Sequence, residues 1–415
     1  MKVLLINATY GNGSTGTIVK DIQELCLKNG VECRTAYAYT SVPENTFKGY
    51  KIGSTLENKI HALLSRINGK SGYYSYFSTK HLIKIIDEYK PDVVNLHNLH
   101  SNYVNLPMLL KALAKRNIPT VVTLHDCWFF TGGCMHYTGI GCSKWLTDCK
   151  NCPKKLKDTP AYFKDKAYAI LADRYRYFGD IPRLYLVGVS KWIMSEAAKT
   201  VFKSADCRFI HNGVNTEIFK PVQSRLRQRL GIEDKYVILG AANKWFSPHN
   251  SQLLSKTIDS LTDGDVLLLF GCTDEQKRIA LPHVITYGFT TNKTEMAELY
   301  SIADVFANCS HEDTLATVNL ESQSCGTPIV SYNNTGLKES IQPDFGNLID
   351  TDNVDSFISA IKSMKGRKDL VTGELREWIK LNFDIKRNYL EYINLYKEII
   401  CCLLYTSPSP RDRTR

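Results

Sequence analysis

Residues 305–331 read VFANCSHEDTLATVNLESQSCGTPIVS, and this stretch shows how the chain folds. Val305–Ala307 and Pro328–Ser331 are short apolar runs that are typical of buried strands. Between them, Thr317–Cys325 has the length and composition of a helix, and Gly326 begins the turn into the second strand. A strand, a helix and a strand in this order predict a parallel sheet covered by helices.

The same alternation continues on both sides of this stretch. Short apolar runs in the first half predict strands at Lys2–Ile6, Cys33–Ala38, Asp92–Leu96, Thr120–Leu124, Leu184–Val189 and Cys207–Ile210. In the second half they predict strands at Tyr236–Ala241, Val266–Phe270 and Val284–Tyr287. Helices are expected at Thr15–Asn29, Leu106–Arg116, Ser251–Leu261, Lys293–Ala303 and, rich in aromatic residues, at Arg376–Ile400. This order predicts two Rossmann-like α/β domains that bind ligands at the carboxyl ends of their strands.

The domain limits follow from the turn-like residues near 211–224. We expect an N-terminal domain over residues 1–220, with a Cys-rich insert at about 127–153. A C-terminal domain is expected over 221–385, and a helix over 386–402 that packs at the domain boundary. Residues 403–415 are rich in Ser, Pro and Arg and have no hydrophobic period, so we interpret them as a tail that is not native.

The composition is that of an ordinary globular protein of 415 residues, with 43% hydrophobic and 23% charged residues. Collagen-like, disordered and small disulfide-rich classes are therefore excluded. The formal net charge of +10 predicts an anionic partner, such as a phosphate group or an anionic membrane surface. No apolar run is long enough to span a membrane, and the N-terminus does not read as a signal peptide. We therefore expect a cytoplasmic protein whose 13 cysteines are reduced.

A glycine-rich loop follows the first expected strand and precedes the first helix. Gly11, Gly13 and Gly16 have the spacing of a dinucleotide-binding loop, which keeps an NAD-type oxidoreductase as an alternative. The second strand, however, ends without the carboxylate that would bind the ribose of such a cofactor. The phosphate-binding property remains, because backbone N–H groups at a helix start can hold a phosphate. The residues that we assign to it are Gly13, Ser14, Thr15 and Gly16. A simple tight turn is the alternative.

Three carboxylates stand in the stretch quoted first. Glu312 and Asp313 fall in the loop after a strand, and Glu321 falls on the helix that follows. A loop carboxylate and a helix carboxylate eight or nine residues apart can converge at the end of a strand, where they suit the hydroxyls of a ribose or hexose. The alternative is a helix cap with a solvated Glu.

At these residues the chain resembles glycosyltransferase family 4. Asp313 and Glu321, followed by Cys325-Gly326-Thr327-Pro328-Ile329-Val330, match the acidic signature of that family. Leu124-His125-Asp126-Cys127-Trp128, Gly188–Trp192 and His211–Asn215 resemble its first-domain motifs in the same order. The resemblance implies the GT-B architecture, in which two Rossmann-like domains face each other across a cleft. It also implies a retaining transfer of a sugar from a nucleotide-diphosphate donor to an acceptor hydroxyl, without a catalytic metal.

The resemblance also implies roles for particular residues. His125 would line the cleft, Glu312 or Asp313 would contact the donor sugar, and Glu321 would bind the donor ribose. The family grips the donor diphosphate with a basic pair after the first strand of its second domain. Lys244 and His249 occupy that stretch here, with His249 in place of the usual Lys. The setting implied is the assembly of capsule, lipopolysaccharide or exopolysaccharide on a lipid-linked or saccharide acceptor, at the inner face of the cytoplasmic membrane.

The Cys-rich insert carries two further hypotheses. The thiols of Cys134, Cys142, Cys149 and Cys152 predict a structural zinc site, with a disulfide or buried reduced thiols as alternatives. Residues 144–166 hold seven Lys against three Asp, which indicates a surface for anionic lipid or a solvated basic face. No nucleic-acid-binding module is recognisable. A zinc-containing basic binding protein without catalysis is the second alternative function.

Overall fold

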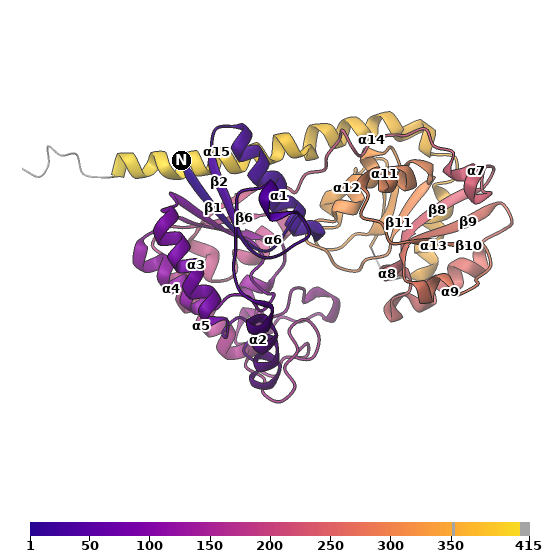
Figure 1. Cartoon of the computed structure of the whole chain (residues 1–415). Helices are drawn as coiled ribbons and strands as arrows, with labels where there is room; N and C mark the ends of the chain where they lie inside the picture. The colour runs from indigo at the N-terminus through magenta and orange to yellow at the C-terminus, as the bar shows by residue number, and fades with distance from the viewer. Residues whose placement is uncertain (351–352, 407–415) are drawn as a thin grey trace, which may run out of the picture. The chain divides into compact units, whose positions relative to one another are not determined.

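The computed structural model describes residues 1–350 and 353–406, and for 402–406 the backbone alone. The chain forms two compact units (Figure 1). The first unit comprises Met1–His211 together with the chain from Tyr389 onward, and the second comprises Asn212–Asn388. The chain therefore leaves the first unit at 211, nine residues before the expected joint at 220, and returns to it at 389.

The first unit is built on a parallel sheet of seven strands in the order β3-β2-β1-β4-β5-β6-β7. The strands are β1 (Lys2–Tyr10), β2 (Glu32–Thr40), β3 (Gly49–Lys51), β4 (Val93–Leu96), β5 (Thr120–Leu124), β6 (Leu184–Gly188) and β7 (Asp206–Phe209). The strand order reverses direction between β1 and β4. Such a switch point is where open α/β sheets bind ligands, outside the carboxyl ends of the strands.

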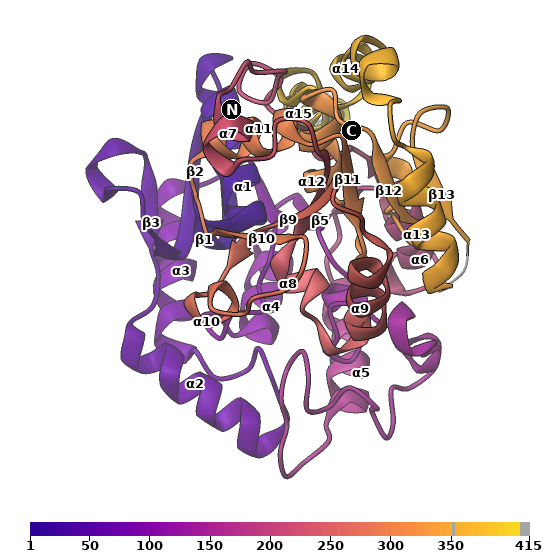
Figure 2. The ribbon, with the colours of Figure 1, turned by 90° about the vertical axis from the view of Figure 1, so that its right-hand side faces the viewer.

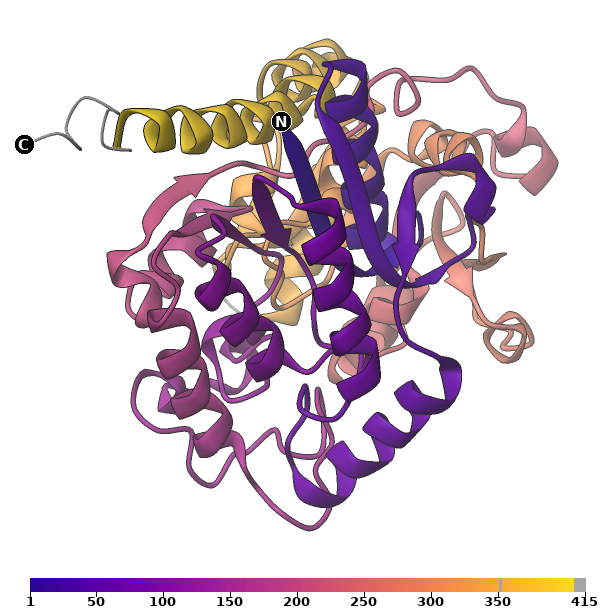
Figure 3. The same cartoon turned by 60° about the vertical axis from the view of Figure 1, so that its left-hand side comes forward.

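Helices cover both faces of this sheet. The helices of this unit are α1 (Gly13–Lys28), α2 (Thr55–Asn68), α3 (Tyr76–Tyr89), α4 (Leu106–Arg116), α5 (Ala167–Gly179), α6 (Lys191–Ala197) and α15 (Ile385–Thr406), of which α2 lies away from the sheet (Figure 1). Helices α3, α4 and α5 lie side by side (Figure 3). Val94 and Leu96 of β4 pack in the same core cluster as residues of α3 and α4. Asn95, between them, points to the other face, where its amide donates to the Tyr396 hydroxyl of α15 at 2.7 Å.

The second unit repeats the architecture with a parallel sheet of six strands in the order β10-β9-β8-β11-β12-β13 (Figure 2). The strands are β8 (Tyr236–Ala241), β9 (Asp265–Cys272), β10 (Val284–Gly288), β11 (Val305–Asn308), β12 (Ile329–Tyr332) and β13 (Asn347–Ile349). The helices are α7 (Leu226–Leu230), α8 (Ala242–Trp245), α9 (Ser251–Ser260), α10 (Asp274–Lys277), α11 (Lys293–Ile302), α12 (Thr317–Ser324), α13 (Val354–Ser363) and α14 (Lys368–Phe383). The switch point of this sheet lies between β8 and β11.

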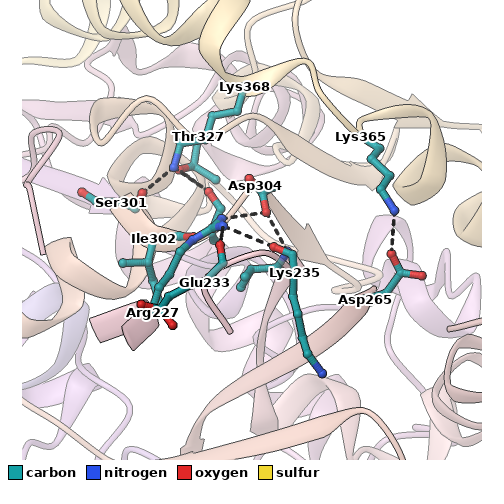
Figure 4. A network of polar contacts seen from close by, with 12 residues as sticks. Arg227, Glu233, Lys235, Asp265, Ser301, Ile302, Asp304, Thr327, Lys365 and Lys368 are labelled. Atoms are coloured by element: carbon teal, nitrogen blue, oxygen red, sulfur yellow. Dashed lines mark hydrogen bonds and ion pairs between the residues drawn. The ribbon is translucent and has the colours of Figure 1, made fainter. Parts of the chain in front are cut away.

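A network of polar contacts lies at the amino ends of the strands of this sheet (Figure 4). Asp304 precedes β11, and its carboxylate accepts hydrogen bonds from the Arg227 guanidinium at 2.7 Å and the Val237 N–H at 2.6 Å. The Lys368 ammonium of α14 donates to the carbonyls of Ser301 and Ala303. Burial lowers the pKa of Lys368 to about 8. The network joins α7, β8, the end of α11 and α14.

The helix expected over Arg376–Ile400 is two helices. Helix α14 ends at Phe383, and α15 begins at Ile385. Asp384 stands between them in an extended conformation; one carboxylate oxygen accepts from the Lys386 N–H and the other from the Thr216 hydroxyl at 2.6 Å. Helix α15 continues to Thr406, so the first four residues of the expected tail 403–415 are helical. The remainder, 407–415, lies outside the described residues.

None of the helices in the described part of the chain combines the length and the hydrophobicity that a membrane span requires.

Candidate active site

The glycine-rich loop lies at the switch point of the first sheet. Gly13, Ser14, Thr15 and Gly16 form the first turn of α1, directly after β1. Gly16 allows close packing there, because a Cβ on it would lie 2.6 Å from Thr9 Oγ1. The Asn12 side chain does not cap the helix, so the N–H groups of the first turn are available to an anion.

Two histidines meet beside this loop. His97 follows β4 and His125 follows β5, and these strands are neighbours in the sheet. His97 Nδ1 lies 2.9 Å from His125 Nε2, with the rings stacked at 5.2 Å between centroids. The amide of Asn98, next to His97, lies 3.4 Å from Thr15 Oγ1, which joins the pair to the start of α1. His97 was not expected from the sequence, although its place directly after a strand was a usable signal.

Burial sets the protonation of this pair. It lowers the pKa of His125 to about 4 against an opposing effect of Asp126, and it lowers the pKa of His97 well below its usual value. Both rings are therefore neutral near pH 7. His125 Nδ1 and His97 Nε2 are buried and have no hydrogen-bond partner in the described part of the chain. The two rings therefore form a neutral pair at the carboxyl ends of β4 and β5.

A second pair supports the histidines. His100 Nε2 lies 3.0 Å from Asp126 Oδ2, and Asp126 Oδ1 accepts from the Trp128 N–H at 2.8 Å. Burial disfavours charge on His100, but Asp126 outweighs it and raises the pKa of His100. The pair fixes the loop directly after His125.

The oxidoreductase alternative lacks its ribose ligand. Glu32 is the first residue of β2, whereas α1 begins at the carboxyl end of the neighbouring β1. Because these strands are parallel, Glu32 lies at the opposite edge of the sheet from the glycine-rich loop. Its carboxylate lies 3.7 Å from Arg34.

In the second unit, Glu321 is held on α12. Its carboxylate accepts a hydrogen bond from the hydroxyl of Tyr300, on α11, at 3.1 Å. Burial raises the pKa of Glu321 to about 7, although the Tyr300 hydrogen bond and Lys293 oppose the shift. The residue as a whole is not completely buried. The Glu321 carboxylate is therefore a hydrogen-bond acceptor that Tyr300 fixes in position, and its charge changes near neutral pH.

The two loop acids differ in their surroundings. Asp313 Oδ1 accepts from the Leu315 N–H at 3.2 Å, and the Asp313 carbonyl accepts from the Gly336 N–H at 3.0 Å. Thr335 also bonds to both backbone groups of Asp313. Asp313 is thus part of the framework of the loop after β11. Glu312 is its half-buried neighbour.

The predicted diphosphate residues lie at the switch point of the second sheet. Lys244 is on α8, directly after β8, and His249 follows it in an exposed position. The His249 ring lies edge-on to His311, with centroids 4.1 Å apart. His311 comes from the loop after β11, so residues from both sides of the switch point meet here.

Asn250 organises this group. Its buried amide donates to the carbonyls of Lys244 and Cys309, each at 3.0 Å, and its Oδ1 lies 2.8 Å from His311 Nε2. Asn250 was not expected from the sequence. Its role depends on bonds across two strands, which periodicity does not reveal.

The predicted zinc residues lie between β5 and α5. Cys134, Cys142, Cys149 and Cys152 are all free thiols, so the disulfide alternative is not what the structure shows. Burial raises the pKa of Cys149 to about 12 and that of Cys134 to about 11, which describes protonated thiols at the edge of the core. Within the described residues, no group of three or more His, Cys, Asp or Glu side chains is arranged to hold a metal ion. Zinc binding stays a prediction, which metal analysis of protein purified without a chelator would test.

Two protein families match the chain. Residues 53–218 match Glycosyltransferase Family 4, and residues 273–377 match Glycosyl transferases group 1. With its two Rossmann-like domains, the chain is a glycosyltransferase of GT-B architecture. Among its relatives is WcaC of Escherichia coli (strain K12), a glycosyl transferase named for colanic acid biosynthesis; it is 21% identical over 96% of this chain and 100% of its own length.

Solved structures show the same fold. Sucrose-phosphate synthase from Thermosynechococcus elongatus superposes with a TM-score of 0.70 at 14% identity, covering 97% of this chain and 99% of its own. Anabaena Alr3699/HepE in complex with UDP-glucose superposes with a TM-score of 0.63 at 14% identity, covering 98% of this chain and 100% of its own. The predicted α/β fold with two Rossmann-like domains is confirmed.

Proposed function

We propose that this protein is a retaining glycosyltransferase that moves a sugar from a nucleotide-diphosphate donor to a hydroxyl of a lipid-linked saccharide. The second unit would bind the donor and the first unit the acceptor. The setting would be the biosynthesis of a cell-surface polysaccharide, as the name of its relative WcaC suggests for that protein. The neighbour with bound UDP-glucose supports the donor class.

The chain's own residues would act by positioning and by stabilising charge. As the bond between the sugar and the diphosphate breaks, negative charge grows on the leaving diphosphate. Lys244 and His249, at the switch point of the second sheet, would hold that group. In the first unit, the N–H groups of the first turn of α1 would hold a phosphate. A retaining reaction of this kind needs no protein nucleophile, because the leaving diphosphate can itself take the proton of the acceptor hydroxyl.

The two sugar-contacting roles would fall to His125 and to one of the two acids, Glu312 or Asp313, in the loop after β11. The neutral His125 would hydrogen-bond the sugar.

The proposal depends most on Glu321. It is a half-buried carboxylate, held by Tyr300, at the position where the family signature places a ribose ligand. Donor turnover should fall by about 100-fold in Glu321→Ala, because a buried hydrogen bond to a charged group contributes about 1.5–3 kcal/mol. Turnover of a panel of nucleotide sugars by the purified protein is the measurement. Glu374→Ala, at an exposed position of α14 in the same unit, is the matched control. Unchanged turnover in Glu321→Ala would refute the assignment.

A further inference from the structure

Helix α2 presents its apolar side to solvent. Its buried residues are polar: Asn58, His61 and Ser65. Its exposed side carries four aliphatic residues, which recur at helical spacing: Leu56, Ile60, Leu63 and Ile67. The side chains of Leu56 and Leu63 are 69% and 55% exposed. An amphipathic helix in a globular protein normally faces the core with its apolar stripe. An apolar stripe that faces solvent instead indicates a surface that binds a partner.

Hydrogen bonds fix the orientation. His61 Nδ1 lies 2.6 Å from Ser75 Oγ, and His61 Nε2 accepts from the Gly72 N–H at 3.1 Å. Burial lowers the pKa of His61 to about 4, so the ring is neutral and keeps these bonds at pH 7. The Asn58 amide donates to the Tyr39 hydroxyl at 2.8 Å. Turning the apolar stripe inward would break all three bonds.

Exposed aromatic residues extend the stripe at both ends. The Phe77 N–H, at the start of α3, donates to the Glu57 carboxylate at 2.8 Å, and the Phe77 ring is 74% exposed. The Tyr162 N–H donates to the Arg66 carbonyl at 2.8 Å, which places the 76% exposed Phe163 beside the end of α2. We call α2 together with Phe77, Tyr162 and Phe163 the α2 patch.

The charges in the α2 patch are basic. Lys59 and Arg66 are exposed, and helical spacing places both along one flank of the aliphatic stripe. Lys80 and Lys164 are exposed beside Phe77 and Phe163. The carboxylate within the patch, Glu57, accepts hydrogen bonds from the start of α3. Aliphatic and aromatic side chains ringed by Lys and Arg are the composition of helices that lie in the headgroup region of an anionic bilayer.

We propose that the α2 patch docks this protein on the surface of an anionic lipid bilayer, with α2 lying in the plane of the interface. At 14 residues, α2 is about 21 Å long, which is enough to bury several side chains without crossing the membrane. This inference rests on the proposed function in one respect only. The proposed function gives docking its purpose, which is to bring the first unit to a lipid-linked acceptor.

Vesicle binding by the full chain tests the proposal. The protein should sediment with vesicles that contain phosphatidylglycerol and remain in solution with phosphatidylcholine alone. The double variant Leu56→Gln/Leu63→Gln should bind the anionic vesicles at least about tenfold more weakly, because each buried Leu contributes more than a factor of ten. Lys59→Glu/Arg66→Glu should lose the preference for anionic lipid. The control Leu370→Gln/Leu381→Gln, which removes leucines 74% and 60% exposed on α14, should bind like the unaltered protein.

Three results would overturn the proposal. They are no binding of the unaltered protein to anionic vesicles, equal binding by Leu56→Gln/Leu63→Gln, and a dimer in free solution that this variant disperses. The last result would make a second copy of the chain the occupant of the α2 patch. Circular dichroism would verify that the variant is folded. Without vesicles, donor turnover by Leu56→Gln/Leu63→Gln should equal that of the unaltered protein. If the unaltered protein itself turns over no donor, the proposed function fails, whatever the result of vesicle binding.

Discussion

The carboxylate of Glu321 belongs to a half-buried residue at the position assigned to the donor ribose. Because burial raises its pKa to about 7, a fraction of this group is protonated at neutral pH, and the protonated form is a poorer acceptor for ribose hydroxyls. His97 and His125 show the opposite effect of the same cause, since burial keeps both rings neutral. The chemistry of each residue thus depends on its surroundings, which the sequence motif alone does not describe.

The first prediction concerns the pH dependence of donor binding. The affinity for the nucleotide-sugar donor should approach its full value only well above pH 7 and should decrease as the pH falls through the pKa of Glu321, about 7. In Glu321→Gln the affinity should be weaker throughout, and this pH dependence should be lost. Donor titrations by calorimetry across this range measure the effect. A pH profile of Glu321→Gln that matches the unaltered protein would contradict the role of the carboxylate.

At the scale of elements, most of the strands were predicted from the sequence, whereas several helices, among them α2, α3, α5, α6 and α13, were not. Buried parallel strands such as Thr120–Leu124 and Tyr236–Ala241 are continuous apolar runs, and the structure confirms their limits. Helix α2 was missed although its aliphatic residues recur at helical spacing, and β3 was missed because it has only three residues. The His97–His125 contact could not be predicted either, because it depends on the register of two strands that lie 24 residues apart in the chain.

A second prediction belongs to the polar network between α7, β8 and α14. Asp304→Asn should lower the free energy of unfolding by about 1–3 kcal/mol, because the Arg227 guanidinium loses its charged partner. Urea unfolding followed by circular dichroism measures it. The exposed pair of Asp274 and Lys277 supplies the control, since Asp274→Asn should change the free energy by less than about 0.5 kcal/mol. Equal effects of the two substitutions would contradict the importance of the network.

At the scale of the molecule, the buried neutral histidines of the first unit make its stability depend on pH. His61 and His125 have pKa values of about 4 in the folded chain and near 6.5 when unfolded. Below pH 6.5 the unfolded chain binds more protons, so stability is complete above 6.5 and is lost as the pH falls toward 4. His100, whose pKa is raised, acts in the opposite direction but is a single group.

The third prediction follows from His61. Its share of the acid-induced loss should reach about 3 kcal/mol, which is the shift expressed as free energy. His61→Gln should lower stability at pH 7 but show a shallower fall on acidification. The exposed His81→Gln should keep the profile of the unaltered protein. Urea unfolding at a series of pH values gives the slopes, and parallel slopes for all three proteins would contradict the prediction.

The return of the chain to the first unit has a consequence for its synthesis. Tyr389, Tyr392 and Tyr396 of α15 are buried, and Tyr396 bonds to Asn95 in the middle of the first sheet. While the ribosome is still producing the second unit, the sheet face around Asn95 has no α15 to cover it. The domain begun first is therefore completed last, and the nascent chain must keep an exposed sheet face from aggregating until residues 389–399 emerge.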